Sequence, residues 1–249
     1  RLLARGEIKE GQAINFAVPT GNFGNILAAY YAGCMGLPIA KLICASNTNK
    51  VLFDFFSTGV YNKERKFHVT MSPSMDILIS SNLERLLYHA SGEDSQWVKK
   101  QMQALHNQGR YSIPAPVQKA LSDFVGGYAT EAETGSAINS VYEQSNYLID
   151  PHTAVAYAVV QKYRTAAKDA TPTVVVATAS PYKFAKDVLT SIDGKYKNYD
   201  DFTLLQEMEQ LTVQALPQAI KELEKKPVLH TKVCEKDEMR QIVENILGL

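Results

Sequence analysis

The sequence has no excess of either charge and no apolar run long enough to cross a membrane. Its 249 residues contain 26 Lys plus Arg and 26 Asp plus Glu, so no net field draws the chain toward nucleic acid or an anionic lipid surface. No segment approaches the roughly 18 apolar residues of a bilayer-spanning helix, and the first residues are too polar for a signal peptide. We therefore expect a cytoplasmic protein with small-molecule partners, without nucleic acid or a membrane.

The chain also has few cysteines, and none of them form a C-x-x-C pair. The three present, Cys34, Cys44 and Cys234, are an odd number, which is typical of reduced thiols rather than of a disulfide framework. Free cysteines are among the most buried residue types, so we expect burial. The chain also lacks an initiating methionine, and residues 2–4 have the pattern of a helix end stopped by Gly6, which predicts a fragment that opens inside an element.

Hydrophobic residues make up 45% of the chain, which is enough for a globular core. A strand is predicted over residues 13–18, a helix over 25–35 and a second strand over 41–45. This β-α-β unit implies parallel strands with a right-handed crossover. A third strand, 173–177, has the apolar composition of a fully buried strand and leads into a helix over 181–192. The predicted fold class is α/β, a parallel sheet flanked by helices.

Three further helices are predicted from periodicity and capping residues. Apolar residues recur at helical spacing from Asp76 to Ala90. Thr130 and Glu133 have the spacing of a capping box. Asp150 followed by Pro151 is a helix start, and that helix is expected to reach Ala167.

The last fifty residues have a different pattern. Residues 201–225 are predicted to be helical, 228–233 extended and 237–247 helical again. We therefore predict two parts, an α/β domain over 1–198 and a mostly helical C-terminal extension over 199–249.

The stretch V-P-T-G-N-F-G-N, residues 18–25, joins the first strand to the first helix. It is not a P-loop, because Gly24 is followed by Asn25 and Ile26 rather than by lysine and a hydroxyl residue. Its G-x-x-G spacing is not the G-x-G-x-x-G of a dinucleotide fold, and the second strand lacks the terminal acid that binds a ribose. A KH-type loop for nucleic acid is disfavoured, since the loop contains no lysine or arginine.

Two interpretations of the loop remain. It is either a tight turn in which glycine supplies unusual dihedral angles, or an anion site at the start of a helix. Thr20 and Asn22 add side-chain donors to the unpaired N–H groups of the helix N-terminus. This combination favours a monophosphate ligand.

Six separated motifs carry a family resemblance. Together, and in this order, they resemble threonine synthases of the long bacterial and fungal type over about residues 10–192. The motifs are P-T-G-N-F-G-N (19–25), S-N-T-N (46–49), S-P-S-M-D-I (72–77), S-N-L-E-R (81–85), I-D-P-H-T-A (149–154) and A-T-A-S-P-Y-K-F (177–184). The resemblance implies a pyridoxal 5'-phosphate enzyme of fold type II, similar to the tryptophan synthase β-subunit.

The resemblance also implies roles for individual residues. The loop residues would hold the cofactor's phosphate; they are Thr20, Gly21, Asn22, Phe23, Gly24 and Asn25. Thr178 matches the hydroxyl that meets the pyridine nitrogen, a position consistent with the carboxyl end of a parallel strand. The alternative is that Thr178 and Ser180 only cap the next helix. We favour Thr178 as the cofactor contact and Ser180 as the cap.

Other polar residues have more than one interpretation. Asn47 and Asn49 either face the cofactor and substrate or form an Asx turn. Asp150 is expected to be a helix cap, and His152 lacks the ligand cluster that a metal needs, so no metal site is predicted. Ser81 and Arg85 could meet an anionic substrate, but an arginine on an amphipathic helix is usually solvated, and the solvated alternative is favoured.

No catalytic residue is predicted in this chain. In the resembling family the Schiff-base lysine lies in an Ala-Phe-Lys-Asp motif well before the glycine loop, and residues 1–17 contain no such motif. Lys9 lies in a segment expected to be an exposed turn, and by the resemblance Lys183 matches a family lysine that is not the Schiff-base residue, so neither is assigned. The chain is expected to require the N-terminal half of the same enzyme and to be inactive alone.

The full-length protein would then be a carbon–oxygen lyase acting on a phosphate ester, converting O-phosphohomoserine and water to threonine and phosphate. Two alternatives remain open. One is a non-catalytic anion-binding module that kept the cradle, and the other is a second pyridoxal-phosphate lyase of the same fold, such as a dehydratase or a β-replacing synthase.

Overall fold

The computed structural model describes residues 1–212 and 214–249, which belong to two compact units, Arg1–Ala215 and Leu216–Leu249. The strands are β1 (Ile14–Pro19), β2 (Ile39–Ser46), β3 (Val60–Asn62), β4 (Arg110–Ser112), β5 (Phe124–Tyr128) and β6 (Thr173–Val175). The α-helices are α1 (Gly24–Cys34), α2 (Val51–Thr58), α3 (Leu83–Ala90), α4 (Ser95–Gln108), α5 (Ala115–Ala120), α6 (Glu131–Ser145), α7 (Pro151–Ala167), α8 (Ala185–Ile192), α9 (Asp201–Leu211) and α10 (Met239–Leu247). Short 3₁₀ helices are η1 (Leu3–Arg5), η2 (Pro73–Met75), η3 (Pro181–Phe184), η4 (Gly194–Asn198), η5 (Leu223–Lys225) and η6 (Lys236–Glu238).

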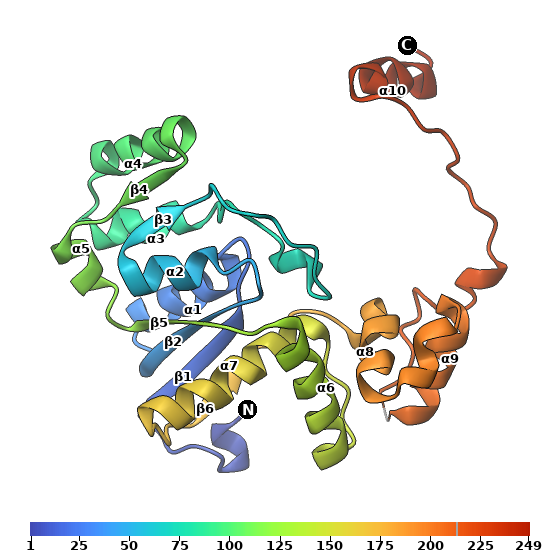
Figure 1. Cartoon of the computed structure of the whole chain (residues 1–249), viewed down its shortest axis with the longest axis horizontal. Coiled ribbons are helices and arrows are strands. Elements are labelled where there is room, and N and C mark those ends of the chain that lie inside the picture. Colours follow the sequence, from blue (N-terminus) through green and yellow to red (C-terminus); the bar gives the residue numbers. More distant parts are fainter. Residues whose placement is uncertain (213) are drawn as a thin grey trace. The chain divides into compact units, whose positions relative to one another are not determined.

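The centre of the first unit is a four-stranded sheet with the order β5-β2-β1-β6 (Figure 1). Every pair in this sheet is parallel; Val18 of β1 lies opposite Cys44 of β2, and Phe16 of β1 lies opposite Val174 of β6. The predicted β-α-β unit and the α/β class are confirmed. Because β1 and β6 are neighbours and run the same way, the loops that follow them emerge at the same edge of the sheet.

The two central strands, β1 and β2, bury both of their faces over most of their length because helices cover the sheet from both sides (Figure 1). Val18, Leu42 and Cys44 point into one cluster together with apolar residues of α1 and α2. Ala17, Ile43 and Ala45, one position along, point into a second cluster formed with α7. The period of two in strand geometry thus assigns alternate residues of one apolar run to two different cores.

The edge strand β5 was not predicted, because its sequence F-V-G-G-Y contains two glycines that weaken a strand signal. The lack of a side chain at Gly126 and at Gly127 has a structural reason. A Cβ atom on Gly127 would lie 2.4 Å from a methyl carbon of Val159 on α7, and one on Gly126 would lie 3.2 Å from the backbone of Phe53 on α2. The two glycines let helices approach β5 from opposite faces.

Strands β3 and β4 form a separate antiparallel pair, which the sequence also did not reveal. The rings of Tyr61 and Tyr111 stack across it with centroids 5.3 Å apart. Burial raises the pKa of Tyr61 to about 12, although the backbone N–H of Ser80 bonds to its hydroxyl oxygen and lowers that pKa. The pair therefore anchors the segment that leads to Ser80.

Two predicted elements within residues 70–180 differ in extent. The strand at 173–177 is shorter and only half-buried rather than fully buried, because β6 is an edge strand with β1 as its one neighbour in this sheet. The helix predicted from Asp76 begins instead at Leu83, because the Asp76 carboxylate is bonded to Asn47, Asn49 and Thr70. The helices at 181–192 and 151–167 and the Thr130–Glu133 capping box are confirmed.

The predicted helix over 201–225 ends at Leu211, and residue 213 lies outside the described residues. Pro217, which has no N–H to donate, follows soon after. In the second unit, residues 228–233, predicted to be extended, form neither a helix nor a strand, and the helix predicted at 237–247 is confirmed as η6 and α10. Helix α9 buries Leu204 and Met208 within the first unit, so the contacts divide at Ala215, and the division at residue 198 stays a prediction.

Among the described residues no helix combines the length and the apolar content needed to traverse a lipid bilayer. The expectation that the cysteines are buried is confirmed for Cys44, only partly met by Cys234 and wrong for Cys34. Cys44 is fully buried in β2 and Cys234 is half-buried, but Cys34 lies in the last turn of α1 and is exposed. The polar segment Gly6–Gly11 is an exposed turn, as predicted, with both glycines at positive φ.

Candidate cofactor site

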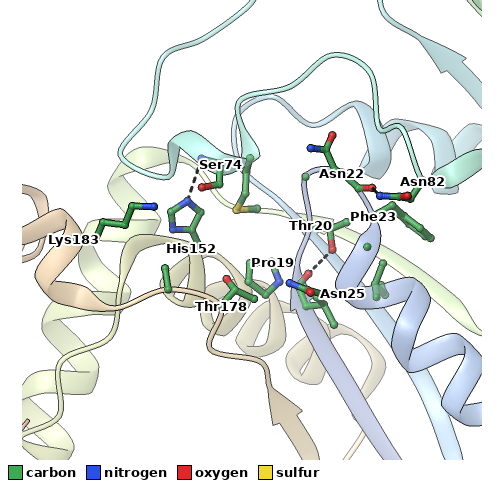
Figure 2. A pocket seen from close by; sticks show the side chains of 16 residues that line it. Pro19, Thr20, Asn22, Phe23, Asn25, Ser74, Asn82, His152, Thr178 and Lys183 are labelled. Carbon is green, nitrogen blue, oxygen red and sulfur yellow. Dashed lines mark hydrogen bonds between the residues drawn. The ribbon is translucent and has the colours of Figure 1, made fainter. Parts of the chain in front are cut away.

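A pocket of about 320 Å³ opens where β1 and β6 end (Figure 2). Its walls come from the β1–α1 loop, the η2 turn, the start of α7 and the segment between β6 and α8. The lining residues are Val18, Pro19, Thr20, Gly21, Asn22, Phe23, Gly24, Asn25, Ile26, Ser74, Met75, Asn82, His152, Thr178, Ala179 and Lys183. All seven cofactor-binding residues predicted from the sequence therefore line one pocket.

The glycine loop presents N–H groups that nothing in the protein uses. From Gly21 to Ile26, six consecutive backbone N–H groups have no acceptor anywhere in residues 1–212 or 214–249. The first N–H group of α1 that finds an intrahelical partner is that of Leu27, which donates to the Phe23 carbonyl. Phe23 itself has φ +67°, the left-handed conformation that turns successive N–H groups toward one concavity.

The carbonyl groups of the same loop are occupied. Ser80 Oγ donates to the Gly21 carbonyl oxygen over 2.7 Å. The backbone N–H and the Nδ2 of Asn82 donate to the Asn22 carbonyl oxygen over 3.2 and 2.7 Å. Since the acceptors are used and the donors are not, the pocket side of the loop is a field of partial positive charge that fits an anion.

Two side chains of the loop serve the fold instead of the pocket. The Thr20 hydroxyl donates to the Val18 carbonyl over 2.7 Å, and its backbone N–H donates to Ala45. Phe23 is 1% exposed, and its ring packs in the core against Phe56 and Phe124, which also stack on each other. Phe23 can thus offer a ligand only its backbone, a role that its side-chain type did not suggest.

Asp150 and His152 hold the wall opposite the loop. The Asp150 carboxylate caps α7 by accepting the N–H groups of His152 and Thr153, which confirms the predicted cap. The ring Nδ1 of His152 lies 2.8 Å from Asp150 Oδ1, and its Nε2 accepts the Ser74 N–H over 3.2 Å. Because Ser74 donates, the neutral ring carries its proton on Nδ1 and ties α7 to the η2 turn.

The environment of Asp150 keeps it ionised. Burial by itself raises the pKa of this carboxyl, but hydrogen bonds from His152 and the Thr153 hydroxyl outweigh burial and hold the pKa below its usual range. The described residues contain no cluster of three or more His, Cys, Asp or Glu side chains arranged to hold a metal ion. The hydrogen bonds of Asp150 and His152 link the start of α7 to the η2 turn.

Thr178 and Lys183 approach the pocket from the side of β6 (Figure 2). Thr178 is exposed, and its hydroxyl has no hydrogen-bond partner in the described part of the chain. Ser180 occupies the N-cap position of η3 without a side-chain capping bond, so the predicted side-chain cap was wrong.

Asn47 and Asn49 are buried beside the pocket rather than in its lining. The Asn49 N–H donates to Asn47 Oδ1 over 2.9 Å, which is the Asx turn of the two alternatives. Both side-chain amides donate to Asp76 Oδ1, over 2.8 and 2.9 Å. A substrate contact for these residues stays a prediction, and Asp76, which sequence analysis placed in a helix, is the residue that holds the 70–76 segment in place.

Ser81 and Arg85, for which a solvated role was favoured, are both exposed. Arg85 Nη1 bonds to Asn82 Oδ1, so Arg85 is linked through Asn82 to the glycine loop. The S-N-L-E-R motif contains both Asn82 and Arg85, but sequence analysis did not pair Asn82 with Asn22 because the two residues lie far apart in the chain.

Comparison with known proteins agrees with this geometry. A family model described as "Threonine synthase, C-terminal" matches residues 153–245. The chain is 45% identical over 200 residues to human "Threonine synthase-like 1", covering 79% of this chain and 26% of that protein. It is also similar to a solved structure of threonine synthase from Brucella melitensis, described as PLP bound, with 41% identity, TM-score 0.70, and coverage of 82% of this chain and 43% of the other.

The chain belongs to the threonine synthase family. The crystal structure of the yeast enzyme has TM-score 0.82 and 31% identity, and the match covers 97% of this chain and 49% of the yeast chain. Family membership, expected from the six short motifs, and the α/β fold, expected from the pattern of strands and helices, are therefore confirmed. The chain spans about a quarter of the human relative and about half of the solved chains, so the activity of a whole enzyme is a matter of inference.

Proposed function

We propose that this chain is part of a threonine synthase that uses pyridoxal 5'-phosphate to convert O-phosphohomoserine and water to threonine and phosphate. The observation that carries this proposal is the run of six unused N–H groups from Gly21 to Ile26, in one pocket with Thr178. The PLP-bound relative from Brucella melitensis supports the choice of cofactor. A cytoplasmic location belongs to the same proposal.

The glycine loop is suited to the cofactor's phosphate. Gly21, Asn22, Phe23, Gly24 and Asn25 supply backbone donors, while the Thr20 side chain stabilises the end of β1. Hydrogen bonds from neutral N–H groups to an ionised acceptor are short and about twice as strong as those between neutral groups. The loop needs no lysine or arginine because α1 adds its positive dipole end.

Thr178 is assigned to the ring nitrogen. When bound, pyridoxal phosphate supplies an electron sink for elimination at the γ-carbon of the substrate and addition of water at the β-carbon. A threonine hydroxyl can accept or donate a hydrogen bond, so it orients the ring without forcing a proton onto the nitrogen, as a carboxylate would. The hydroxyl lies free in the same pocket as the cradle.

His152 and Ser74 are assigned to positioning. The bond between them joins the first turn of α7 to the η2 turn, both of which line the pocket. Asp150 keeps the proton on Nδ1 of His152 and so keeps Nε2 available for the Ser74 N–H. A rigid wall of this kind holds a bound ring in one orientation.

The lysine that links the cofactor covalently is assigned to a part of the enzyme outside this sequence. Lys9 is exposed, its backbone N–H bonds to Gln12, and it does not line the pocket. Lys183 lines the pocket, but its position after β6 matches a different lysine of the family, so we assign neither. The 249-residue chain is then expected to be inactive by itself.

One alternative retains support. The human relative carries the name "Threonine synthase-like 1", so a different pyridoxal-phosphate lyase reaction on the same scaffold is the second candidate. A non-catalytic anion-binding module is the third; it predicts anion binding without turnover.

The experiment that tests the proposal uses the complete enzyme. Purified protein is loaded with pyridoxal phosphate and supplied with O-phosphohomoserine, serine or threonine, and threonine, phosphate and keto acids are measured. Equal amounts of threonine and phosphate from O-phosphohomoserine support the proposal. Keto acid from serine or threonine, with no threonine formed, would favour the second candidate, and no product from any substrate would favour the third.

The missing lysine is tested on the 249-residue chain. The chain is mixed with pyridoxal phosphate, reduced with borohydride and mapped by mass spectrometry. We expect no stoichiometric adduct on any single lysine. Full labelling of Lys9 or Lys183, together with threonine formation, would show that this chain carries its own catalytic lysine.

A further inference from the structure

The pocket has one charged side chain of fixed sign, and it is a cation. Of its sixteen lining residues, Lys183 is the one with a permanently charged side chain. The others are glycines, residues with apolar, amide or hydroxyl side chains, and His152 with its neutral ring. Within residues 1–212 and 214–249, no carboxylate lies within salt-bridge distance of the Lys183 ammonium. This contrasts with Lys50, Lys162 and Lys195, each of which is paired with an acid.

The backbone that carries Lys183 is held firmly, and the side-chain Nζ lies 5.7 Å from the centroid of the neighbouring Phe184 ring. Its N–H donates to the Ser180 carbonyl over 3.1 Å, and Pro181 and Tyr182 before it are buried. The Phe184 ring after it packs on His152 with centroids 4.9 Å apart. Figure 2 shows the side chain beside His152, on the opposite side of the pocket from the glycine loop.

The pocket therefore has two separate positive regions. One is the set of N–H groups on the β1–α1 loop, and the other is the ammonium group on the segment between β6 and α8. If the loop holds the cofactor's phosphate, the exposed Lys183 ammonium, which has no carboxylate partner among the described residues, is available to a second anion. The proposed substrate is an anion at both ends, with a carboxylate and a phosphate ester.

We propose that Lys183 binds an oxyanion of the substrate, either the carboxylate or the phosphate ester, and thereby sets the selectivity of the site for anionic amino acids. This assignment rests on the proposed function for the identity of the loop's ligand. An ammonium on a flexible four-carbon stem is a point charge that can follow a substrate into the pocket, which distinguishes it from the fixed N–H groups of the loop.

The test uses cofactor-loaded enzyme, so that the loop is occupied, and two simple probes. Propyl phosphate reports on a phosphate-ester contact and butyrate on a carboxylate contact, each titrated by ligand-observed NMR. Lys183→Met keeps most of the stem and removes the charge, whereas Lys183→Arg keeps the charge. Lys186→Met is the matched control, because Lys186 is exposed on α8 three residues away and does not line the pocket.

Lys183→Met should weaken one of the two probes about ten- to a hundredfold, the range expected for a lost charge-assisted hydrogen bond. The affected probe identifies the group that Lys183 binds. Lys183→Arg should stay within several-fold of the wild type, and Lys186→Met should not differ from it. The affinity for pyridoxal phosphate, measured by absorbance after dialysis, should be the same in all four proteins.

The inference would be overturned if the wild type and Lys183→Met bound the probes with equal affinity, or if the wild type bound neither probe. It would also be overturned if Lys183→Met lost affinity for the cofactor while its affinity for both probes stayed unchanged. The last result would place Lys183 in the cofactor's own site. Failure of the proposed function would give a different result, because the enzyme would then not take up pyridoxal phosphate or would not form threonine. The probe comparison between wild type and Lys183→Met can then still be made on cofactor-free protein.

Discussion

Gly21 and Ser74 approach so closely that a side-chain carbon on Gly21 would lie 2.5 Å from the Ser74 carbonyl oxygen. The contact brings together residues from the β1–α1 loop and from the η2 turn. Ser80 reinforces it by donating to the Gly21 carbonyl. The absence of a side chain at position 21 is thus what allows the cradle and its opposite wall to meet, and it does not depend on unusual dihedral angles.

Gly21→Ala should therefore displace the η2 turn and weaken phosphate binding, with a loss of about 1–3 kcal/mol in the free energy of unfolding from overpacking. Gly24→Ala is the matched control for stability, because a Cβ there would only reach Asn82 Nδ2 at 3.7 Å, an ordinary contact. Urea unfolding compares the stability of the two variants, and a phosphate titration followed by amide NMR compares Gly21→Ala with the wild type. Equal losses of stability in the two variants would show that the Gly21 contact is unimportant.

Before the cofactor is added, the loop itself should bind phosphate or sulfate with an affinity in the millimolar range. Each charge-assisted hydrogen bond contributes about 1.5–3 kcal/mol before desolvation and ordering are subtracted. Gly24→Val should abolish binding while the protein stays folded, since the branched side chain occupies space that the anion needs. If the amides of Gly21, Asn22 and Gly24 do not shift in the wild type, the loop is only a turn.

Thr178→Val in the complete enzyme should preserve the fold and lower turnover several-fold to about tenfold. The reason is the loss of one hydrogen bond of about 0.5–1.5 kcal/mol at the ring nitrogen. Ser180→Ala is the control, because the Ser180 side chain makes no capping bond and does not line the pocket. Steady-state kinetics compare the two, and a larger defect in Ser180→Ala would transfer the ring-nitrogen role to that residue.

Asp150→Asn should make the protein less stable at neutral pH and less sensitive to acid. The folded-state pKa of Asp150 is depressed below its unfolded value of about 3.9, so the carboxylate stabilises the fold above that pH and this contribution is lost as pH falls through the folded-state pKa. We expect a loss of about 1.5–3 kcal/mol at pH 7, the range for hydrogen bonds to a charged group.

Asp200→Asn is the comparison for Asp150→Asn. Asp200 caps α9 through the N–H groups of Phe202 and Thr203, but it is exposed, so solvent replaces much of what is lost. Its effect on unfolding should be clearly smaller. Chemical denaturation at pH 7 and at several pH values below 4 provides the measurement, and equal effects for the two variants would contradict the assigned role of burial.

The cysteines should differ sharply in reactivity. Cys34 is exposed at the end of α1, whereas burial raises the pKa of the Cys44 thiol to about 12, an effect that a hydrogen bond with Thr20 only partly opposes. Iodoacetamide at pH 8 should label Cys34 at least about a hundredfold faster than Cys44, because the thiolate is the reactive form. Mass spectrometry after timed quenching measures this, and rapid labelling of Cys44 in folded protein would contradict the buried core.

The sequence by itself determined the local features of this protein. The apolar runs of β1 and β2, the capping box at Thr130 and the Asp150–Pro151 helix start depend on neighbours within a few residues, and all were predicted correctly. The order of six short motifs also identified the family. These signals are readable because hydrophobic periodicity and helix capping act over one or two turns of chain.

Tertiary structure decided what depends on distant residues. Strand β5 exists because α2 and α7 pack against its glycines, and the helix predicted from Asp76 starts late because Asn47, Asn49 and Thr70 bond to that carboxylate. The pocket in turn depends on contacts such as Ser80 with Gly21 and Ser74 with His152, which join residues 59 and 78 positions apart. No local pattern encodes such pairs, because their free energy is gained only once the folded chain has brought both partners together.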